Sequence, residues 1–329
     1  MERLSYKTLE KLGFEGYLMP EGTERVLQFG EGNFLRAFVD YFIDLANERT
    51  GWGAKVVAVQ PIAQGRCEDI NRQDGLYTVY LRGLENGGQV IRKRVVSSIS
   101  RALNPYEDYG ALLACAANPD LRYIVSNTTE AGIAFDENSR FDEEPPGSFP
   151  AKLTRFLYER YSCFKGEAGR GLVILSCELI DHNGDELKRC VGQYTKLWKL
   201  EPEFAEWLDR EVIFCSTMVD RIVTGYPRAE AEALNAQNGY EDLLLDTGGA
   251  AGDRGGGLHA LQEAQGPHAQ RRPDHHGAGL LLIGPGHCAQ MHGGPGYLLL
   301  HGALRLRRDH PGADRVPERG IGGLRSGPV

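Results

Sequence analysis

The sequence predicts an α/β fold, with a doubly wound Rossmann-type parallel sheet, an inserted antiparallel hairpin, and a disordered or non-native tail. Three observations support this prediction. Short apolar runs alternate with amphipathic segments of helical period, a glycine turn joins the first run to the first such segment, and the composition changes abruptly near Gly248. The 329 residues, 41% of them hydrophobic, are enough for two ordinary domains.

The first βαβ unit opens the readable part of the chain. Val26–Phe29 is an apolar run, Gly30–Gly32 is a turn, and Phe34–Asn47 has the period of an amphipathic helix. Lys55–Val59 then has the composition of a buried parallel strand. The aromatic and aliphatic side chains of the helix are expected to face the sheet. Four polar side chains are expected to face solvent: Arg36, Asp40, Asp44 and Glu48.

A hairpin follows, and then the α/β alternation resumes. Leu76–Leu84 and Gln89–Ile99 are rich in Val, Tyr and Ile, and an Asn86-Gly87 turn of the kind that favours hairpins lies between them. The later elements are predicted as a helix at Tyr106–Ala117, a strand at Tyr123–Ser126, a helix at Ala151–Phe164, a strand at Leu172–Ser176, helices at Gly184–Trp198 and Glu201–Arg210, and a last segment at Val212–Thr224.

Charge and composition exclude several function classes. The net charge is -8, from 37 basic and 45 acidic side chains, so we expect neither a nucleic-acid nor a membrane partner. The absence of a long apolar run or a signal-peptide core predicts a cytoplasmic protein. Seven scattered cysteines without a C-x-x-C pair predict buried thiols rather than disulfides or a metal site.

The chain divides into two compositions. Residues 1–247 are predicted to form a dinucleotide-binding domain, whereas 248–329 is a tail rich in Gly, Pro, Arg and His. The tail is either a disordered segment or an out-of-frame translation of a GC-rich gene. We favour the second interpretation, because the Ser, Glu, Lys and Gln of ordinary disordered tails are scarce or missing there. Its irregularly spaced histidines, including His275 and His276, do not predict a metal site.

The glycine turn is the first candidate for chemistry. Gly30 and Gly32 would let backbone amides approach a pyrophosphate at the start of a helix. Leu35 replaces the third glycine of G-x-G-x-x-G, so spacing alone leaves a cofactor site and a plain turn equally open. Gln60 stands where an acidic residue would select the ribose hydroxyl of NAD, which leaves the choice between NAD and NADP open.

Two further polar segments follow predicted strands, and a charged pair lies inside the last predicted segment. Asn127–Gly132 lies at the carboxyl edge of the sheet, where ligands of such folds collect, although a capping turn is an equal alternative. Cys177–Gly184 follows the next strand, and its Asn-Gly pair is also a turn signal. Asp220 and Arg221 lie between apolar neighbours and form either a site or a structural ion pair.

Several blocks in order carry a resemblance to a known family. They are Leu27–Phe38, Gln73–Thr78, Ser126–Gly132, Pro150–Arg155, Cys177–Gly184 and Cys215–Pro227. Together they resemble the polyol-specific long-chain dehydrogenases, the mannitol dehydrogenase family. The Glu178-Leu179-Ile180-Asp181 segment is similar to the branch that acts on uronate-derived sugar acids.

The resemblance implies an NAD-dependent interconversion of D-altronate and D-tagaturonate, with a small-molecule sugar acid as the partner. It implies that Asn127 and Thr128 lie near the nicotinamide ribose and that Asn183 and Asp220 face the substrate, with Asn183 donating a hydrogen bond to the reacting oxygen. The pyrophosphate would be held by Leu27, Gln28, Phe29, Gly30, Glu31, Gly32, Asn33, Phe34, Leu35, Arg36, Ala37 and Phe38. Alternatives are another sugar-acid or polyol dehydrogenase, such as a fructuronate reductase, and a non-catalytic nucleotide-binding fragment.

One departure from the family bears on activity. The resemblance implies a helical second domain with a Lys-x4-Asn-x2-His motif that supplies the general base. Here no lysine follows Lys199 and no asparagine follows Asn238, so the tail cannot contain that motif. Because general acid–base catalysis contributes roughly 10² to 10⁴ in rate, we expect little or no turnover from this chain.

Overall fold

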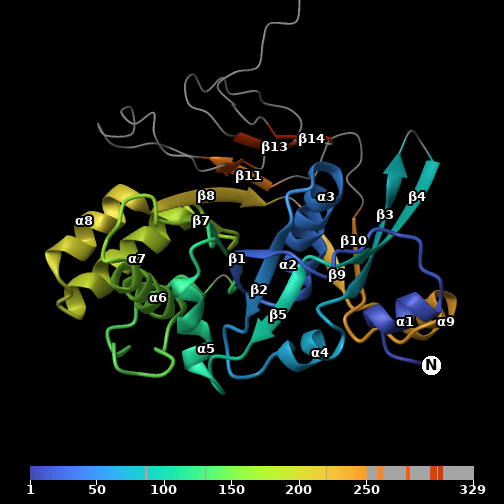
Figure 1. The fold of residues 1–329 in the computed structure, drawn as a ribbon, viewed down its shortest axis with the longest axis horizontal. Helices are drawn as coiled ribbons and strands as arrows, with labels where there is room; N and C mark the ends of the chain where they lie inside the picture. The colour runs from blue at the N-terminus through green and yellow to red at the C-terminus, as the bar shows by residue number, and fades with distance from the viewer. Residues whose placement is uncertain are drawn as a thin grey trace, which may run out of the picture.

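The computed structural model describes residues 1–85, 88–129, 131–219, 221–249, 258–261, 279–281, 297–301 and 303–306. Its main sheet has seven strands in the order β11-β8-β7-β6-β1-β2-β5 (Figure 1). These strands are β1 (Thr23–Phe29), β2 (Ala54–Val59), β5 (Ile99–Leu103), β6 (Tyr123–Ser126), β7 (Val173–Ser176), β8 (Ile213–Val219) and β11 (Leu258–Leu261). All neighbouring pairs are parallel except β11 with β8. The predicted doubly wound parallel sheet is therefore confirmed.

A second, mixed sheet contains the predicted hairpin. Its order is β4-β3-β10-β9, and its strands are β3 (Tyr77–Glu85), β4 (Gly88–Val96), β9 (Val223–Gly225) and β10 (Asp246–Gly249). Glu85 pairs with Gly88 across the hairpin, as the turn signal predicted. The second hairpin strand, however, ends at Val96 rather than at Ile99, which begins β5 in the main sheet. Asp44 fixes this break, because its Oδ1 accepts hydrogen bonds from both N and Oγ of Ser97.

The helices follow the predicted order, with three additions. They are α1 (Tyr6–Lys11), α2 (Asn33–Leu35), the π-helical η1 (Arg36–Asp40), α3 (Tyr41–Thr50), α4 (Cys67–Arg72), α5 (Tyr109–Ala114), the 3-10 helix η2 (Cys115–Ala117), α6 (Phe149–Phe164), α7 (Asn183–Leu197), α8 (Pro202–Glu211) and α9 (Ala231–Asn238). Helices α1, α4 and α9 and strand β10 have no counterpart in the predicted set. Helix α6 begins where Oγ of Ser148 accepts a hydrogen bond from the amide of Ala151.

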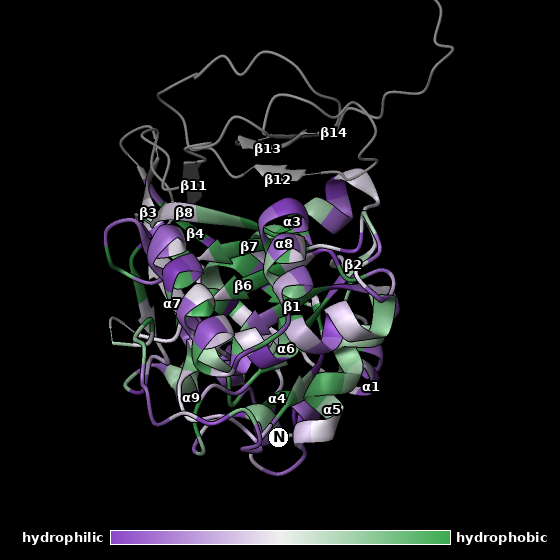
Figure 2. Cartoon of the chain, turned by 90° about the vertical axis from the view of Figure 1, so that its left-hand side faces the viewer, coloured by the Kyte–Doolittle hydropathy of each residue, from purple (hydrophilic) through white to green (hydrophobic). Residues whose placement is uncertain are grey.

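Alternate residues of the main sheet face two separate apolar layers. Val26 and Val56 pack on the side of the continuous helical run 33–50, which β3 covers from outside. Leu27 and Val57 point the other way, onto helices α5, α6, α7 and α8. Figure 2 shows the green strands β1, β6 and β7 beside helices that carry many hydrophilic residues, drawn in purple. The core of the molecule therefore surrounds the main sheet on both faces.

The predicted solvent face of the first helix is wrong at three of four positions. Arg36 is 3% exposed, and Asp40 and Asp44 are fully buried, whereas Glu48 is exposed as expected. The reason is tertiary: the second sheet packs on this side of the helical run, where Asp246 of β10 binds Arg36 and Arg94 of β4 binds Asp44. Asp40 instead accepts a hydrogen bond from Gln28 of β1. Of the three, Arg36 also contacts the glycine turn directly, at the carbonyl of Glu31.

The tail contributes only short strands to the described residues. Besides β11, a three-stranded sheet contains β12 (Gly279–Leu281), β13 (Tyr297–His301) and β14 (Ala303–Leu306). The rest of 250–329, including His275 and His276, lies outside the described residues, so the disordered or out-of-frame origin of the tail stays a prediction. No helix in the described ranges is both long and apolar enough to cross a membrane. Six cysteines of these ranges are free thiols.

Candidate functional site

The glycine turn lies where the strand order of the main sheet reverses. Strands β1 and β6 are parallel neighbours, with Phe29 paired to Ser126, and the chain leaves them toward opposite halves of the sheet. Ligands of open α/β sheets bind at this point, beyond the carboxyl ends of the strands. Gly30 and Asn127, which follow these two strands, are therefore neighbours.

The conformation of the turn requires its first glycine. Gly30 has φ +124°, and a Cβ there would lie 2.8 Å from the backbone oxygen of Asn127. Gly32 is different: it caps helix α2 with φ -67°, and a Cβ at this position would meet nothing within 4 Å. No side chain accepts a hydrogen bond at this cap, so the first amides of the helical run have no side-chain partner there.

The carbonyl groups of Gly30 and Glu31 in the turn are held from the protein interior. Nε2 of Gln28 donates to the carbonyl oxygen of Gly30 at 3.0 Å and also to Oδ2 of Asp40 at 3.0 Å. Nη1 of Arg36 donates to the carbonyl oxygen of Glu31 at 2.5 Å. Two side chains of the same βα unit thus fix the orientation of the peptide groups in the turn.

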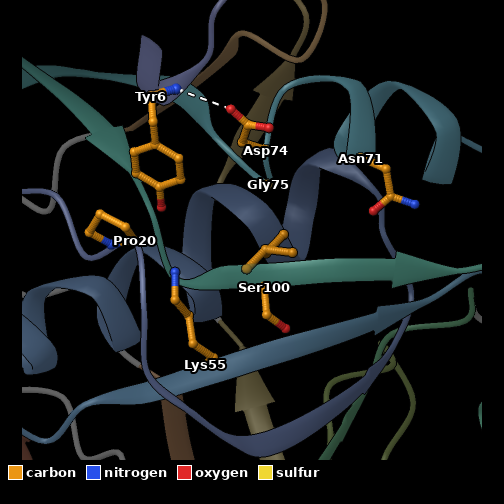
Figure 3. Close-up of a pocket in the computed structure, with 8 residues that line it drawn as sticks. Tyr6, Pro20, Lys55, Asn71, Asp74, Gly75 and Ser100 are labelled. Atoms are coloured by element: carbon orange, nitrogen blue, oxygen red, sulfur yellow. Dashed lines mark hydrogen bonds between the residues drawn. The ribbon is translucent and has the colours of Figure 1, made fainter. Parts of the chain in front are cut away.

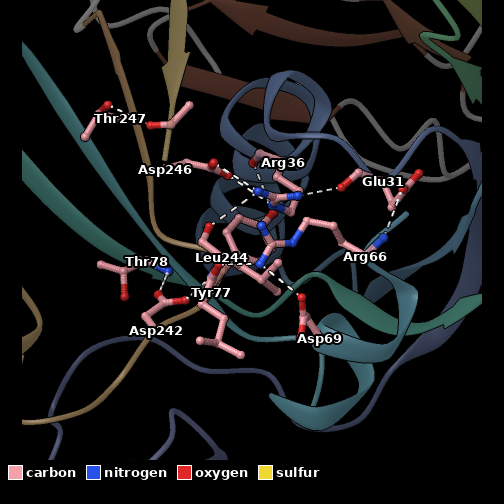
Figure 4. A network of polar contacts seen from close by, with 12 residues as sticks. Glu31, Arg36, Arg66, Asp69, Tyr77, Thr78, Asp242, Leu244, Asp246 and Thr247 are labelled. Atoms are coloured by element: carbon pink, nitrogen blue, oxygen red, sulfur yellow. Dashed lines mark hydrogen bonds and ion pairs between the residues drawn. The ribbon is translucent and has the colours of Figure 1, made fainter. Parts of the chain in front are cut away.

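Arg36 connects the turn to strand β10 of the second sheet. Its guanidinium makes a two-point contact with Asp246 in β10, with Nε to Oδ2 and Nη2 to Oδ1 both at 3.0 Å (Figure 4). The Arg36 side chain is 4% exposed and that of Asp246 is fully buried. Burial raises the pKa of Asp246 to about 6, although the nearby Arg36 charge acts in the opposite direction.

The predicted cofactor block separates into an exposed part and a framework. Gly32 and Asn33 are exposed and Phe34 is half-buried, so these three residues can contact a ligand. The rest of the block is buried and positions the turn. This framework consists of Leu27, Gln28, Phe29, Gly30, Glu31, Leu35, Arg36, Ala37 and Phe38.

Asn127 and Thr128 lie next to the turn and are held by a buried glutamate. Glu178, 2% exposed, accepts hydrogen bonds at Oε1 from both N and Oγ1 of Thr128, and at Oε2 from Oγ of Ser126. Burial raises the pKa of this carboxyl, and these hydrogen bonds oppose the shift. Nδ2 of Asn127 donates to the carbonyl of Cys177. The ends of β6 and β7 are thereby joined.

Gln60 does not occupy an open ribose position. It is 3% exposed, and its Nε2 donates to the carbonyl oxygens of Ile62 and Ala63. The loop after β2 also packs on the turn, because Oε1 of Glu31 accepts a hydrogen bond from the amide of Arg66. Gln60 therefore shapes its own loop.

Asn183 is committed to backbone contacts. It is fully buried, its Nδ2 donates to the carbonyl oxygens of Glu178 and Thr217, and its Oδ1 accepts from the amides of Gly184 and Thr217. A hydrogen bond from Nδ2 to a substrate oxygen would require one of these contacts to open. Asp220, the other predicted substrate residue, lies outside the described residues.

The sequence analysis did not identify Asp246, Glu178 and Asp40 as residues that hold this site together. Asp40 was assigned to solvent, Asp246 belongs to an unpredicted strand, and Glu178 served only as part of a family block. The one available signal for Glu178 was its position directly after a buried strand. Within the described part of the chain, no group of three His, Cys, Asp or Glu side chains converges as in a metal centre.

A pocket of about 400 Å³ lies elsewhere, at the amino end of the sheet (Figure 3). Lys55 at the start of β2 and Ser100 at the start of β5 lie on one side, and Tyr6 and Asp74 lie on the other. Nζ of Lys55 donates to the carbonyl oxygens of Met19 and Ser97. The parallel strands point away from this pocket, so it is separate from the glycine turn.

Comparisons with known proteins agree with this architecture. Altronate oxidoreductases from Klebsiella pneumoniae subsp. pneumoniae and Yersinia enterocolitica are 51% and 49% identical to this chain over 242 residues, which is 73% of this chain and 50% of each relative. The chain thus spans about half the length of the curated relatives it matches. A Pseudomonas fluorescens mannitol 2-dehydrogenase, solved as a ternary complex with NAD and D-mannitol, has a similar fold with a TM-score of 0.64 at 24% identity, covering 75% of this chain and 52% of that one.

A family model covers the same region. Residues 24–248 match the model described as the mannitol dehydrogenase Rossmann domain, which includes all but the first residue of β1, the glycine turn and all but the last residue of β10. This match covers more than half of the chain, and its end agrees with the change in composition near Gly248. The chain therefore belongs to the mannitol dehydrogenase family.

Proposed function

We propose that residues 24–248 bind NAD at the glycine turn, as the cofactor-binding part of an oxidoreductase that interconverts D-altronate and D-tagaturonate. The observation that carries the proposal is the turn itself, which places an uncapped helix N-terminus and an exposed glycine at the reversal point of a parallel sheet. The 51% identity to proteins named altronate oxidoreductase supports the choice of substrate.

The residues of the turn fit a dinucleotide. A pyrophosphate needs backbone amides that it can approach closely, and the space beside Gly32 has no atom within 4 Å of where a Cβ would stand. The positive end of the helical run 33–50 adds favourable electrostatics for an anion. The Glu31 carboxyl is directed to the loop after β2, where its Oε1 accepts a hydrogen bond from the amide of Arg66, and burial raises its pKa.

Each neighbouring residue has a proposed part in binding. The amides at Gly32 and Asn33 contact the pyrophosphate, while Asn127 and Thr128 border the nicotinamide ribose from the end of β6. The bound dinucleotide supplies hydride transfer to or from the sugar acid. Asn183 and Asp220 remain proposed substrate residues, and Asn183 serves this role only by releasing a backbone contact.

The exposed glycine provides the sharpest test. Gly32→Ala introduces a methyl group into open space at a φ that alanine adopts readily, so the protein should fold with a loss of no more than about 1–2 kcal/mol, the cost of alanine at a helix N-cap. The same methyl group would stand where the pyrophosphate approaches. We expect the NADH dissociation constant, measured by fluorescence titration, to rise roughly tenfold or more, the effect of losing one charge-assisted hydrogen bond.

A second glycine serves as the control. Gly192→Ala, within α7, also places a methyl group in open space but lies far along the chain from the turn. It should leave NADH affinity unchanged. Failure of the wild-type chain to bind NADH, or unchanged affinity in Gly32→Ala, would contradict the proposed cofactor site.

A further inference from the structure

We infer that Arg36 and Asp246 form a positioning pair that aims the amides of the glycine turn at the diphosphate of the dinucleotide. This inference rests on the proposed function and deepens it, because it assigns a binding role to two buried residues that do not touch the ligand. It also makes β10, more than 200 residues along the chain, a required part of the cofactor site.

The geometry of a trans peptide connects the pair to the ligand. In a planar trans peptide group the C=O and N–H bonds point in opposite directions. Arg36 holds the carbonyl of Glu31 inward, so the N–H of Gly32 points outward, into the space that is open beside Gly32. Gln28 fixes the preceding peptide by holding the carbonyl of Gly30, and the N–H of that peptide donates to the carboxyl of Glu31 itself, so the amide of Gly32 is the one that the pair presents.

Arg36 can hold this carbonyl only because its own position is fixed. The planar guanidinium makes two parallel contacts with Asp246 and a third with the carbonyl of Leu244, the last at 3.5 Å. Tyr77 adds a ring face 5.6 Å from the guanidinium carbon, and its hydroxyl donates to the carbonyl of Arg36. These contacts leave Arg36 little freedom to turn away from Glu31 (Figure 4).

The pair is buried where a single charge would be costly. Arg36 and Asp246 lie almost fully inside the protein, so each one needs the other to offset its desolvation. A pair of this kind contributes little net stability compared with apolar residues of the same volume. The pair instead fixes an orientation, because the planar guanidinium of arginine holds a carboxylate and a carbonyl in one plane.

Two conservative variants of the full-length chain test the pair. Arg36→Lys keeps the charge but cannot contact Asp246 at two points and Glu31 at a third. Asp246→Asn keeps the size of the buried side chain but removes its charge. For both we expect the dissociation constants of NADH and ADP-ribose to rise roughly tenfold or more, the effect of misaligning one charge-assisted hydrogen bond. Adenosine, which has no phosphate, should bind within a factor of about two of wild type, since it makes no such bond.

An arginine in the sheet that contains β10 provides the matched control. Arg82 in β3 makes a two-point contact with Glu230, but this pair is exposed and neither contact involves the turn. Arg82→Lys should leave the affinities for NADH and adenosine unchanged. A variant that only misplaces the amides should bind NADH and ADP-ribose more weakly and adenosine normally. A general loss of structure would weaken the binding of all three ligands. Unfolding curves recorded in parallel identify any variant that does not fold, and Asp246→Asn then replaces Arg36→Lys.

The outcomes separate this inference from the proposed function. If the wild-type chain binds NADH and both variants bind it as tightly as wild type does, the positioning pair is overturned and the proposed function stands. An equal loss of NADH and adenosine binding also overturns it, because the pair would then be purely structural. Wild-type chain that does not bind NADH at all overturns the proposed function and the inference together.

Discussion

At the residue scale, Asp40 is a carboxyl group in an unfavourable position. It is fully buried, and its single side-chain donor is Nε2 of Gln28, while its Oδ1 has no partner among the described residues. Burial raises the pKa of Asp40 to about 7. Because the folded protein binds this proton more tightly than the unfolded chain does, Asp40 lowers stability progressively as pH rises from about 4 to about 7.

Asp40→Asn removes this cost and should change the pH dependence of stability. The amide keeps an oxygen for Gln28 but never ionises, so the variant should gain stability over wild type as pH rises, by roughly 1.4 kcal/mol for each unit of pKa shift. Urea unfolding at pH 5 and pH 8 measures the difference. Asp209→Asn, at an exposed position, should show no such pH-dependent gain. A difference between Asp40→Asn and wild type that is the same at both pH values would contradict the assignment.

Glu178 gives a second prediction at this scale. Its carboxylate accepts three hydrogen bonds from Ser126 and Thr128, so Glu178→Leu leaves all three donors without their acceptor. We expect the free energy of unfolding to fall by about 1–3 kcal/mol, the cost of buried unpaired polar groups. Glu178→Gln keeps one acceptor oxygen and should lose less. Equal stability of the two variants, measured by urea unfolding, would rule out this role for the carboxylate.

At the element scale, the β1–α2 connection depends on one glycine conformation. Gly30→Ala must accept both a positive φ and a contact with the backbone oxygen of Asn127, whereas Gly51→Ala, after α3, has a positive φ but nothing within 4 Å. The control should cost roughly 1–2 kcal/mol of backbone strain. Gly30→Ala should cost clearly more, and its NADH affinity should fall. Similar unfolding free energies for the two variants would show that the contact with the backbone oxygen of Asn127 adds no further cost at Gly30.

The same scale shows where sequence patterns succeed. The strands Val26–Phe29 and Tyr123–Ser126 and the hairpin were predictable because each is a continuous apolar or β-branched run beside a turn signal. Strand β10, by contrast, is Asp246-Thr247-Gly248-Gly249, and of these residues only Thr247 favours a strand. It forms because β3 and β9 offer it partners on both sides.

At the scale of the whole molecule, we expect the chain to bind the cofactor without catalysing the reaction at a normal rate. The matched region carries the turn and the reversal point, while residues 250–329 contain no lysine that could act as the family's general base. We therefore predict that the 329-residue chain binds NADH but oxidises it with tagaturonate at a rate at least roughly 10²-fold below that of a full-length relative. A coupled absorbance assay on both proteins decides this, and comparable rates would refute the prediction.

The sequence by itself determined the βαβ order, the glycine turn, the hairpin and the family, because these depend on local periodicity and on residues close together in the chain. Only the tertiary structure decided which charges of the first helix are buried, since the second sheet covers a face that a local pattern assigns to water. The contact between Arg36 and Asp246 belongs to this second group. It joins residues 210 positions apart, and packing rather than local propensity brings them together.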